Sequence, residues 1–90
     1  MTQNHQIREI ILYIDNTKRL YNYALWIKKG ANKALLKNKF SKEQLLKATR
    51  RLLNEAIRSY NKEFSTSKLN LTLQSKKRAD MLIIKGLKND

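Results

Sequence analysis

The side chains that could do chemistry in this sequence are lysines, arginines and one tryptophan. In the stretch LYNYALWIKKGANKALLKNKF, residues 20–40, two tyrosines and Trp26 stand among five lysines and no acid. Ammonium and guanidinium groups bind phosphates, and an indole ring can stack on an unpaired base. This composition is typical of a nucleic-acid-binding surface. A packed helix with a basic, solvated rim would contain the same residue types.

Positive charge extends this pattern along the chain. The sequence has 20 Lys+Arg against 7 Asp+Glu, a formal net charge of +13, and no acid lies between Asp15 and Glu43. Such a density concentrates polyanions, so we predict a surface that binds phosphates without sequence preference. Alternatively, lysine is simply the default surface residue of a chain rich in Asn and Ile. The candidate binding residues are Arg19, Trp26, Lys28, Lys29, Lys33, Lys37, Lys47, Arg50, Arg51, Arg58 and Lys62.

Two positions are open for Trp26. In the first it stacks on bases, because on a helix it shares an arc, roughly opposite the isoleucine stripe, with Arg8, Asp15, Arg19 and Asn22. In the second it is buried against the last helix or another subunit, as part of a second apolar seam formed by Leu20, Tyr23 and Ile27. The sequence does not separate the two.

The residues needed for most kinds of catalysis are missing. There is no cysteine, and His5 is the single histidine, so neither a metal site nor a nucleophile activated by histidine is available. The carboxylates have basic neighbours that would keep them ionised, which does not suit a general acid. We therefore predict a protein that is not an enzyme, with no catalytic residue, metal or cofactor.

The N-terminal segment gives no sign of a membrane. Its longest uninterrupted apolar run is Ile10 to Ile14, far short of the roughly 20 residues of a membrane span, and it lacks a basic leader with a small-residue cleavage site. We predict a soluble, cytoplasmic protein without a membrane partner.

The backbone pattern predicts an all-α fold, a small bundle in one domain over residues 1–90. The chain has no proline and only two glycines, so the many turns of a sheet protein are improbable. A long N-terminal helix is predicted, which either ends at Gly30 or runs through it to about Lys37. Its core face is Ile7, Ile10, Ile11, Ile14, Tyr21, Ala24 and Leu25.

A second long helix is predicted over 42–64. Ser41 and Gln44 have the spacing of a capping box, and Phe40 and Leu45 have that of a hydrophobic staple. Its core face should contact the first helix through Leu45, Leu52, Leu53, Ala56 and Tyr60, and its opposite arc is Lys47, Arg51, Asn54, Arg58 and Lys62.

A short C-terminal helix should begin at Ser75 as its N-cap, after an extended, packed connection over 68–74. Lys76, Lys77 and Arg78 then fall in its first turn, where the helix dipole opposes positive charge. Either an anionic partner compensates for this placement, or solvent exposure makes it tolerable.

Three segments carry a resemblance to known sequences. They are DNTKRLYNY at 15–23, KFSKEQLLKA at 39–48 and EAIRSYNKEF at 55–64. Together they resemble a group of small phage-encoded helical proteins, and the match spans roughly residues 10–64. That group has no agreed activity, so the resemblance implies an origin in a phage or mobile element and assigns no role to any residue.

Three functions fit these observations. The leading one is a small basic phage or mobile-element protein that binds DNA or RNA with little sequence preference. The second is a host- or defence-directed inhibitor, of the anti-CRISPR kind, whose basic face occupies an acidic groove on a nucleic-acid-processing protein complex. The third is a minor virion or assembly component. A homodimer is compatible with each of them.

Overall fold

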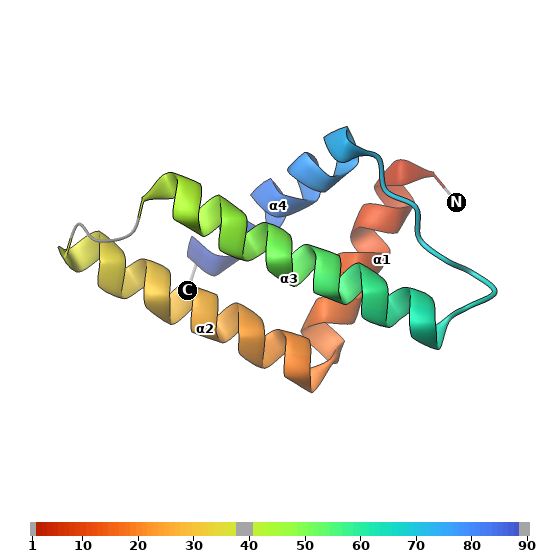
Figure 1. Ribbon diagram of the computed structural model, residues 1–90, viewed down its shortest axis with the longest axis horizontal. Helices are drawn as coiled ribbons and strands as arrows, with labels where there is room; N and C mark the ends of the chain where they lie inside the picture. Colours follow the sequence, from red (N-terminus) through yellow and green to blue (C-terminus); the bar gives the residue numbers. More distant parts are fainter. Residues whose placement is uncertain (1, 38–40, 89–90) are drawn as a thin grey trace.

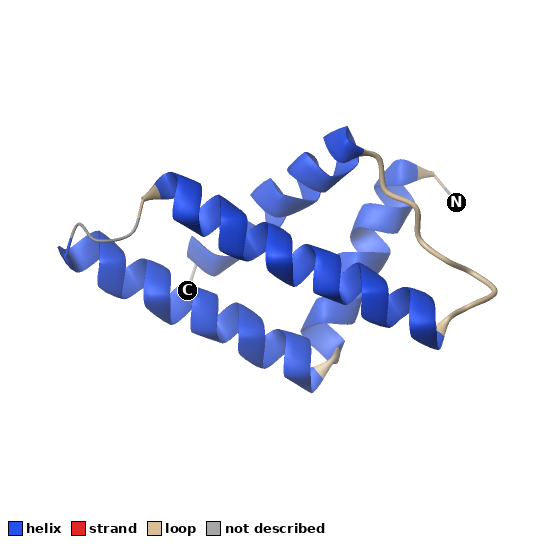
Figure 2. Cartoon of the chain, in the orientation of Figure 1, coloured by secondary structure: helices blue, strands red, loops and turns tan. Residues whose placement is uncertain are grey.

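The computed structural model describes the backbone of residues 2–37 and 41–88, and the side chains of residues 2–29 and 41–86. Nearly all of this backbone is helical (Figures 1 and 2). The helices are α1 (Gln3–Asn16), α2 (Lys18–Lys37), α3 (Lys42–Glu63) and α4 (Leu73–Lys88). No strand occurs in the described ranges. The predicted all-α bundle is therefore confirmed.

The helix α3 is the central element of the bundle. It lies antiparallel to α2, and the two form the front of the molecule in Figure 1, with α1 and α4 behind them. Every pair of helices is in contact. Because α3 packs on its neighbours from two sides, only one of its faces remains for solvent.

The predicted long N-terminal helix is wrong in one respect, because the chain turns at Thr17. Thr17 has an extended backbone, with φ −106° and ψ 110°, and its carbonyl accepts from the Tyr21 N–H at 2.8 Å. In a straight helix, Leu20 would point about 120° away from Ile14. The turn brings both of these residues into the core. The backbone of α2 then continues as a helix through Gly30 to Lys37.

The turn at Thr17 also changes which aromatic residue faces the core. Tyr21 would continue the isoleucine stripe of a straight helix and was predicted to be buried, yet its exposed fraction is 46%. The core instead takes two residues of the second apolar seam, Leu20 and Ile27. From the other helices it receives Ile7, Ile10, Ile14, Leu52, Leu53, Ala56, Tyr60, Ala79 and Ile83.

The start of α3 follows the sequence prediction. The Gln44 N–H donates to the Ser41 hydroxyl oxygen at 3.1 Å, and the Ser41 N–H donates to the Gln44 side-chain oxygen at 3.1 Å, which completes the capping box. Phe40, the other half of the predicted staple, lies outside the described residues. At the far end, the Phe64 N–H donates to the Tyr60 carbonyl and closes the last turn at 2.8 Å.

The connection between α3 and α4 is extended and packed over residues 68–72, as predicted, whereas the last two residues of the predicted segment, Leu73 and Gln74, begin α4. Leu69 and Leu71 are buried in the core. Asn61 of α3 holds the backbone of Leu69 on both sides: its carbonyl oxygen accepts from the Leu69 N–H at 2.6 Å, and its amide donates to the Leu69 carbonyl at 3.1 Å. A side-chain amide thus supplies the hydrogen bonds that a paired strand would otherwise give.

Two glutamines of α1 hold the rest of this connection. The Gln6 side-chain oxygen accepts from the Asn70 N–H at 2.7 Å. The Gln3 side-chain oxygen accepts from the Thr72 N–H at 3.0 Å, and its amide donates to the Asn70 carbonyl at 3.1 Å. The start of α1 therefore holds in place the segment that leads into α4.

The predicted start of the C-terminal helix is wrong by one turn. The helix α4 begins at Leu73, and the Thr72 hydroxyl oxygen accepts from the Ser75 N–H at 3.1 Å. Ser75 is buried inside the first turn instead of capping it. Lys77 and Arg78 consequently lie beyond that turn, where the helix dipole acts weakly, so their position no longer indicates an anionic partner.

Candidate nucleic-acid interface

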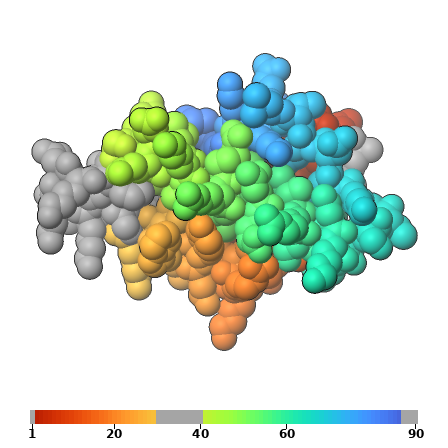
Figure 3. All heavy atoms as spheres, in the orientation of Figure 1, coloured from red at the N-terminus to blue at the C-terminus, as the bar shows by residue number. Residues whose placement is uncertain are grey.

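The exposed face of α3 presents a row of cations. Lys47, Arg51, Arg58 and Lys62, which we call the basic row, are all exposed and recur at helical spacing along the side that faces away from the core. The row extends over about 22 Å of helix. In the space-filling view, α2 and α3 make up most of the front face, with α4 along its upper edge (Figure 3).

The basic row forms few ion pairs. Among the described residues, Lys47, Arg51 and Lys62 form no ion pair with an acid. The remaining member, Arg58, has its guanidinium 3.7 Å from a carboxylate oxygen of Glu55. Three of the four cations are therefore available to an external anion.

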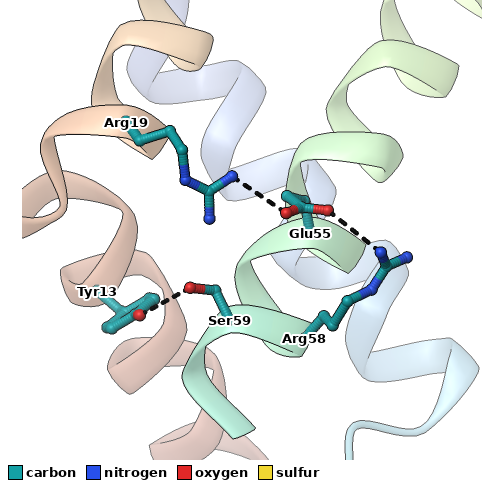
Figure 4. A network of polar contacts seen from close by, with 5 residues as sticks. All are labelled: Tyr13, Arg19, Glu55, Arg58 and Ser59. Atoms are coloured by element: carbon teal, nitrogen blue, oxygen red, sulfur yellow. Dashed lines mark hydrogen bonds and ion pairs between the residues drawn. The ribbon is translucent and has the colours of Figure 1, made fainter. Parts of the chain in front are cut away.

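The side chain of Glu55, a residue of α3, forms ion pairs with two arginines, one on α2 and one on α3. Its other carboxylate oxygen is 3.1 Å from the Arg19 guanidinium (Figure 4). Two guanidinium groups on one carboxylate leave a net positive charge at this point. Exposed ion pairs contribute only about 0–1 kcal/mol, so a phosphate can replace Glu55 at Arg58 at little cost. Arg19 thus shares a carboxylate with one member of the basic row.

Arg50 lies apart from the basic row, although the sequence grouped it with the binding residues. Its guanidinium contacts one carboxylate oxygen of Asp80 in α4, with nitrogen–oxygen distances of 2.7 Å from Nε and 2.6 Å from Nη2. The other oxygen of Asp80 is buried and makes no hydrogen bond. Arg50 therefore ties α3 to α4, because its position on the helix turns it towards α4 while Arg51 points outwards.

The structure describes the side chains of two of the four candidate lysines of α2, and they differ in exposure. Lys29 is exposed, whereas Lys28 is half-buried and lines, with Asp15, a cavity of about 260 Å³ that is bounded by α1, α2 and α4. The side chains of Lys33 and Lys37 lie outside the described part of the structure. Of the four lysines predicted for the α2 part of the surface, the structure thus shows one, Lys29, to be exposed.

Trp26 is exposed, so it is not buried against the last helix, which was one of the positions open to it. Its exposed fraction is 69%, the largest among the large hydrophobic side chains that the structure describes. The second seam does form, since Leu20 and Ile27 are buried, but it leaves Trp26 outside. The ring of Tyr23 meets the indole edge to face, with centroids 6.0 Å apart and planes at 75°.

Comparison with known proteins identifies no relative. No family model matches this chain, and no curated protein or solved structure matches it either. The resemblance to phage-encoded proteins therefore stays a prediction. The candidate interface rests on the charge and exposure of its own residues.

Two other kinds of feature are absent from the described residues. No helix there combines the length and the apolar composition that crossing a membrane requires. Within the same residues, no three His, Cys, Asp or Glu side chains are grouped so that they could hold a metal ion. His5 lies on the exposed side of α1, with its ring nitrogen 3.7 Å from Glu9.

Proposed function

We propose that this protein binds nucleic acid through the basic row of α3, by contacts to phosphates. The observation that supports the proposal most directly is the row itself: four exposed cations on one helix face, about 22 Å long, with three of them unpaired within the described structure. A net charge of +13 adds a long-range attraction for polyanions. The proposal includes a phage or mobile-element origin and action in the cytoplasm of the host cell.

Binding of this kind has little sequence preference. Reading base edges in a groove relies on amide and guanidinium side chains placed in hydrogen-bonding pairs. The exposed amides of α3 are Asn54 and Gln44, and the Gln44 side chain already accepts from the Ser41 N–H in the capping box. Contacts to phosphates position a protein without identifying bases. We therefore expect similar affinities for unrelated sequences and a steep decrease of affinity with salt.

The proposal is tested by titrating labelled DNA and RNA with the purified protein at about 50 mM salt and above. The test variant combines Lys47→Gln, Arg51→Gln and Arg58→Gln. Each lost phosphate contact should lower the salt slope by about 0.9 for duplex DNA and about 0.7 for a single strand. All sequences should lose affinity by a similar factor, with an unchanged helical circular dichroism spectrum.

The matched control removes the same charge elsewhere. Lys18, Lys68 and Lys85 are exposed and lie outside the row, so their triple glutamine variant should keep most of the affinity and the salt slope. Equal weakening in both triple variants would mean that net charge alone attracts nucleic acid.

If wild-type protein binds no nucleic acid at low salt, the proposal is wrong. The inhibitor hypothesis would then gain support from a stoichiometric partner in host lysate that survives nuclease treatment and is lost with the row variant.

A further inference from the structure

We infer that the preferred ligand is a single strand, with Trp26 stacked on one of its bases beside the basic row. This inference rests on the proposed function and specifies its substrate class. It starts from the exposure of Trp26, whose indole is 69% exposed although two neighbours in sequence, Leu25 and Ile27, are at least partly covered. The edge-to-face contact with Tyr23 supports the indole on one side only.

The helical spacing places Trp26 on the side of α2 that borders α3. Trp26 follows Arg19 by seven residues, which is almost two full turns of a helix. The two side chains therefore leave the helix axis in directions only about 20° apart. Arg19 reaches across to Glu55 of α3 at 3.1 Å. The indole therefore lies on the side of α2 that borders α3, as Arg19 does.

The ion pair between α2 and α3 also sets the level of Trp26 along the basic row. Seven residues correspond to about 10.5 Å along α2. Because α3 runs antiparallel to α2, moving forward from Arg19 to Trp26 along α2 corresponds to moving backward by seven residues from Glu55 along α3. That position is Ala48, which lies between Lys47 and Arg51 in the sequence. The indole is thus level with the first half of the row, across the seam between the two helices.

The surroundings of Trp26 favour a base over a protein side chain. Its exposed neighbours one turn away on α2 are Asn22 and Lys29, and α2 contains no acid. The exposed Tyr21 is about 140° away around the helix. A protein-binding hot spot has apolar neighbours that exclude water. An indole among amide and ammonium groups is the arrangement that stacks bases.

Only a strand with accessible bases can use both features together. In a duplex, the faces of the bases are covered by their neighbours, so the indole could reach one only after unpairing. A single strand can place phosphates on Lys47 and Arg51 and turn one base onto Trp26. The duplex is left with the phosphate contacts alone.

The single tryptophan of the chain makes the test direct. The protein is titrated with a mixed-sequence single strand of about 12 nucleotides and with the corresponding duplex, while the intrinsic fluorescence and the affinity are measured. We expect the single strand to quench the fluorescence more strongly than the duplex. Trp26→Leu should weaken single-strand binding about 5- to 140-fold and leave duplex binding nearly unchanged.

Two further variants keep the result interpretable. Trp26→Phe preserves an aromatic face and should retain more of the single-strand affinity than Trp26→Leu, even if the leucine variant folds poorly. Tyr21→Leu removes an exposed aromatic residue from the other side of α2 and should leave the strand preference unchanged.

Each outcome separates this inference from the proposed function. Equal quenching by both ligands, or equal effects of Trp26→Leu on both affinities, would overturn the role of Trp26 while the phosphate-binding row still stands. Loss of preference in Tyr21→Leu as large as that in Trp26→Leu would also overturn it. Absence of any binding in the wild type would overturn both.

Discussion

Arg50 and Arg58 are the same residue type on the same helix, and their surroundings differ completely. The Arg50 side chain is 27% exposed and meets an Asp80 side chain that is 6% exposed, at 2.6 Å. The Arg58 side chain is 79% exposed and lies 3.7 Å from Glu55, which it shares with Arg19. The first arginine compensates a buried charge, and the second holds its partner only loosely.

This difference shows what a count of positive charges leaves out. A cation that neutralises a buried carboxylate stabilises the fold. If it bound a ligand instead, the carboxylate would remain buried without a partner and the fold would lose stability. A cation in an exposed pair contributes about 0–1 kcal/mol to stability and is free to exchange partners. Under the proposed function, binding of nucleic acid to α3 should therefore follow its exposed face, although Arg50 is as basic as Arg58.

The largest effect is expected for Arg50→Gln. The variant leaves the Asp80 carboxylate buried without its cation, which should lower the free energy of unfolding by about 3–5 kcal/mol. Urea unfolding followed by circular dichroism measures this change. A loss below about 1 kcal/mol would show that the pair behaves like a surface contact, and the contrast with Arg58 would disappear.

A smaller loss is expected for Asp80→Asn. The remaining guanidinium of Arg50 is partly exposed and can turn towards water, so the variant should lose about 1–3 kcal/mol, in the range of a hydrogen bond to a charged group. The same unfolding experiment tests this order. If Asp80→Asn costs more than Arg50→Gln, the buried carboxylate is not the group that needs compensation.

The smallest effect on stability is expected for Arg58→Gln. Because its contact is long and exposed, the free energy of unfolding should change by less than about 0.5 kcal/mol. Its affinity for nucleic acid should fall, with a salt slope reduced by about one phosphate contact. Stability and binding measured on one preparation would sharpen the comparison, and a strongly destabilised Arg58→Gln would contradict it.

The parts of the fold that depend on local signals could be predicted from the sequence. The start of α3 follows from Ser41 and Gln44, whose side chains need only each other's backbone. Its apolar and basic faces follow from helical spacing, because α3 is one uninterrupted helix. The burial of Leu69 and Leu71 likewise follows from their alternation with polar residues, but the third leucine of this alternation, Leu73, begins α4 and is exposed.

The break at Thr17 could not be predicted in this way. No glycine or proline marks it, and a single threonine is a weak helix breaker. The break results from packing, since it turns Leu20 and Ile27 into a core that the isoleucine stripe alone would not fill. The wrong placement of Tyr21 follows from the same cause.

The candidate site was predicted in composition but not in arrangement. The basic face of α3 and the exposed Trp26 could be proposed from spacing. The pairing of Arg50 with Asp80 joins residues 30 positions apart, and only the packing of α4 on α3 brings them together. The one signal in the sequence is that Asp80 is a lone acid in a segment of lysines and apolar residues.

The hydrogen bonds between α1 and the connection that joins α3 to α4 have a consequence for the order of folding. The hydrogen bonds that the Asn70 N–H donates to Gln6 and the Thr72 N–H donates to Gln3 close loops of 64 and 69 residues in a chain of 90. Loop closure on this scale loses entropy that only a nearly complete core can offset. The backbone amides of Asn70 and Thr72 are thus shielded from solvent exchange only when both ends of the chain have met, which makes them reporters of the final closure of the domain.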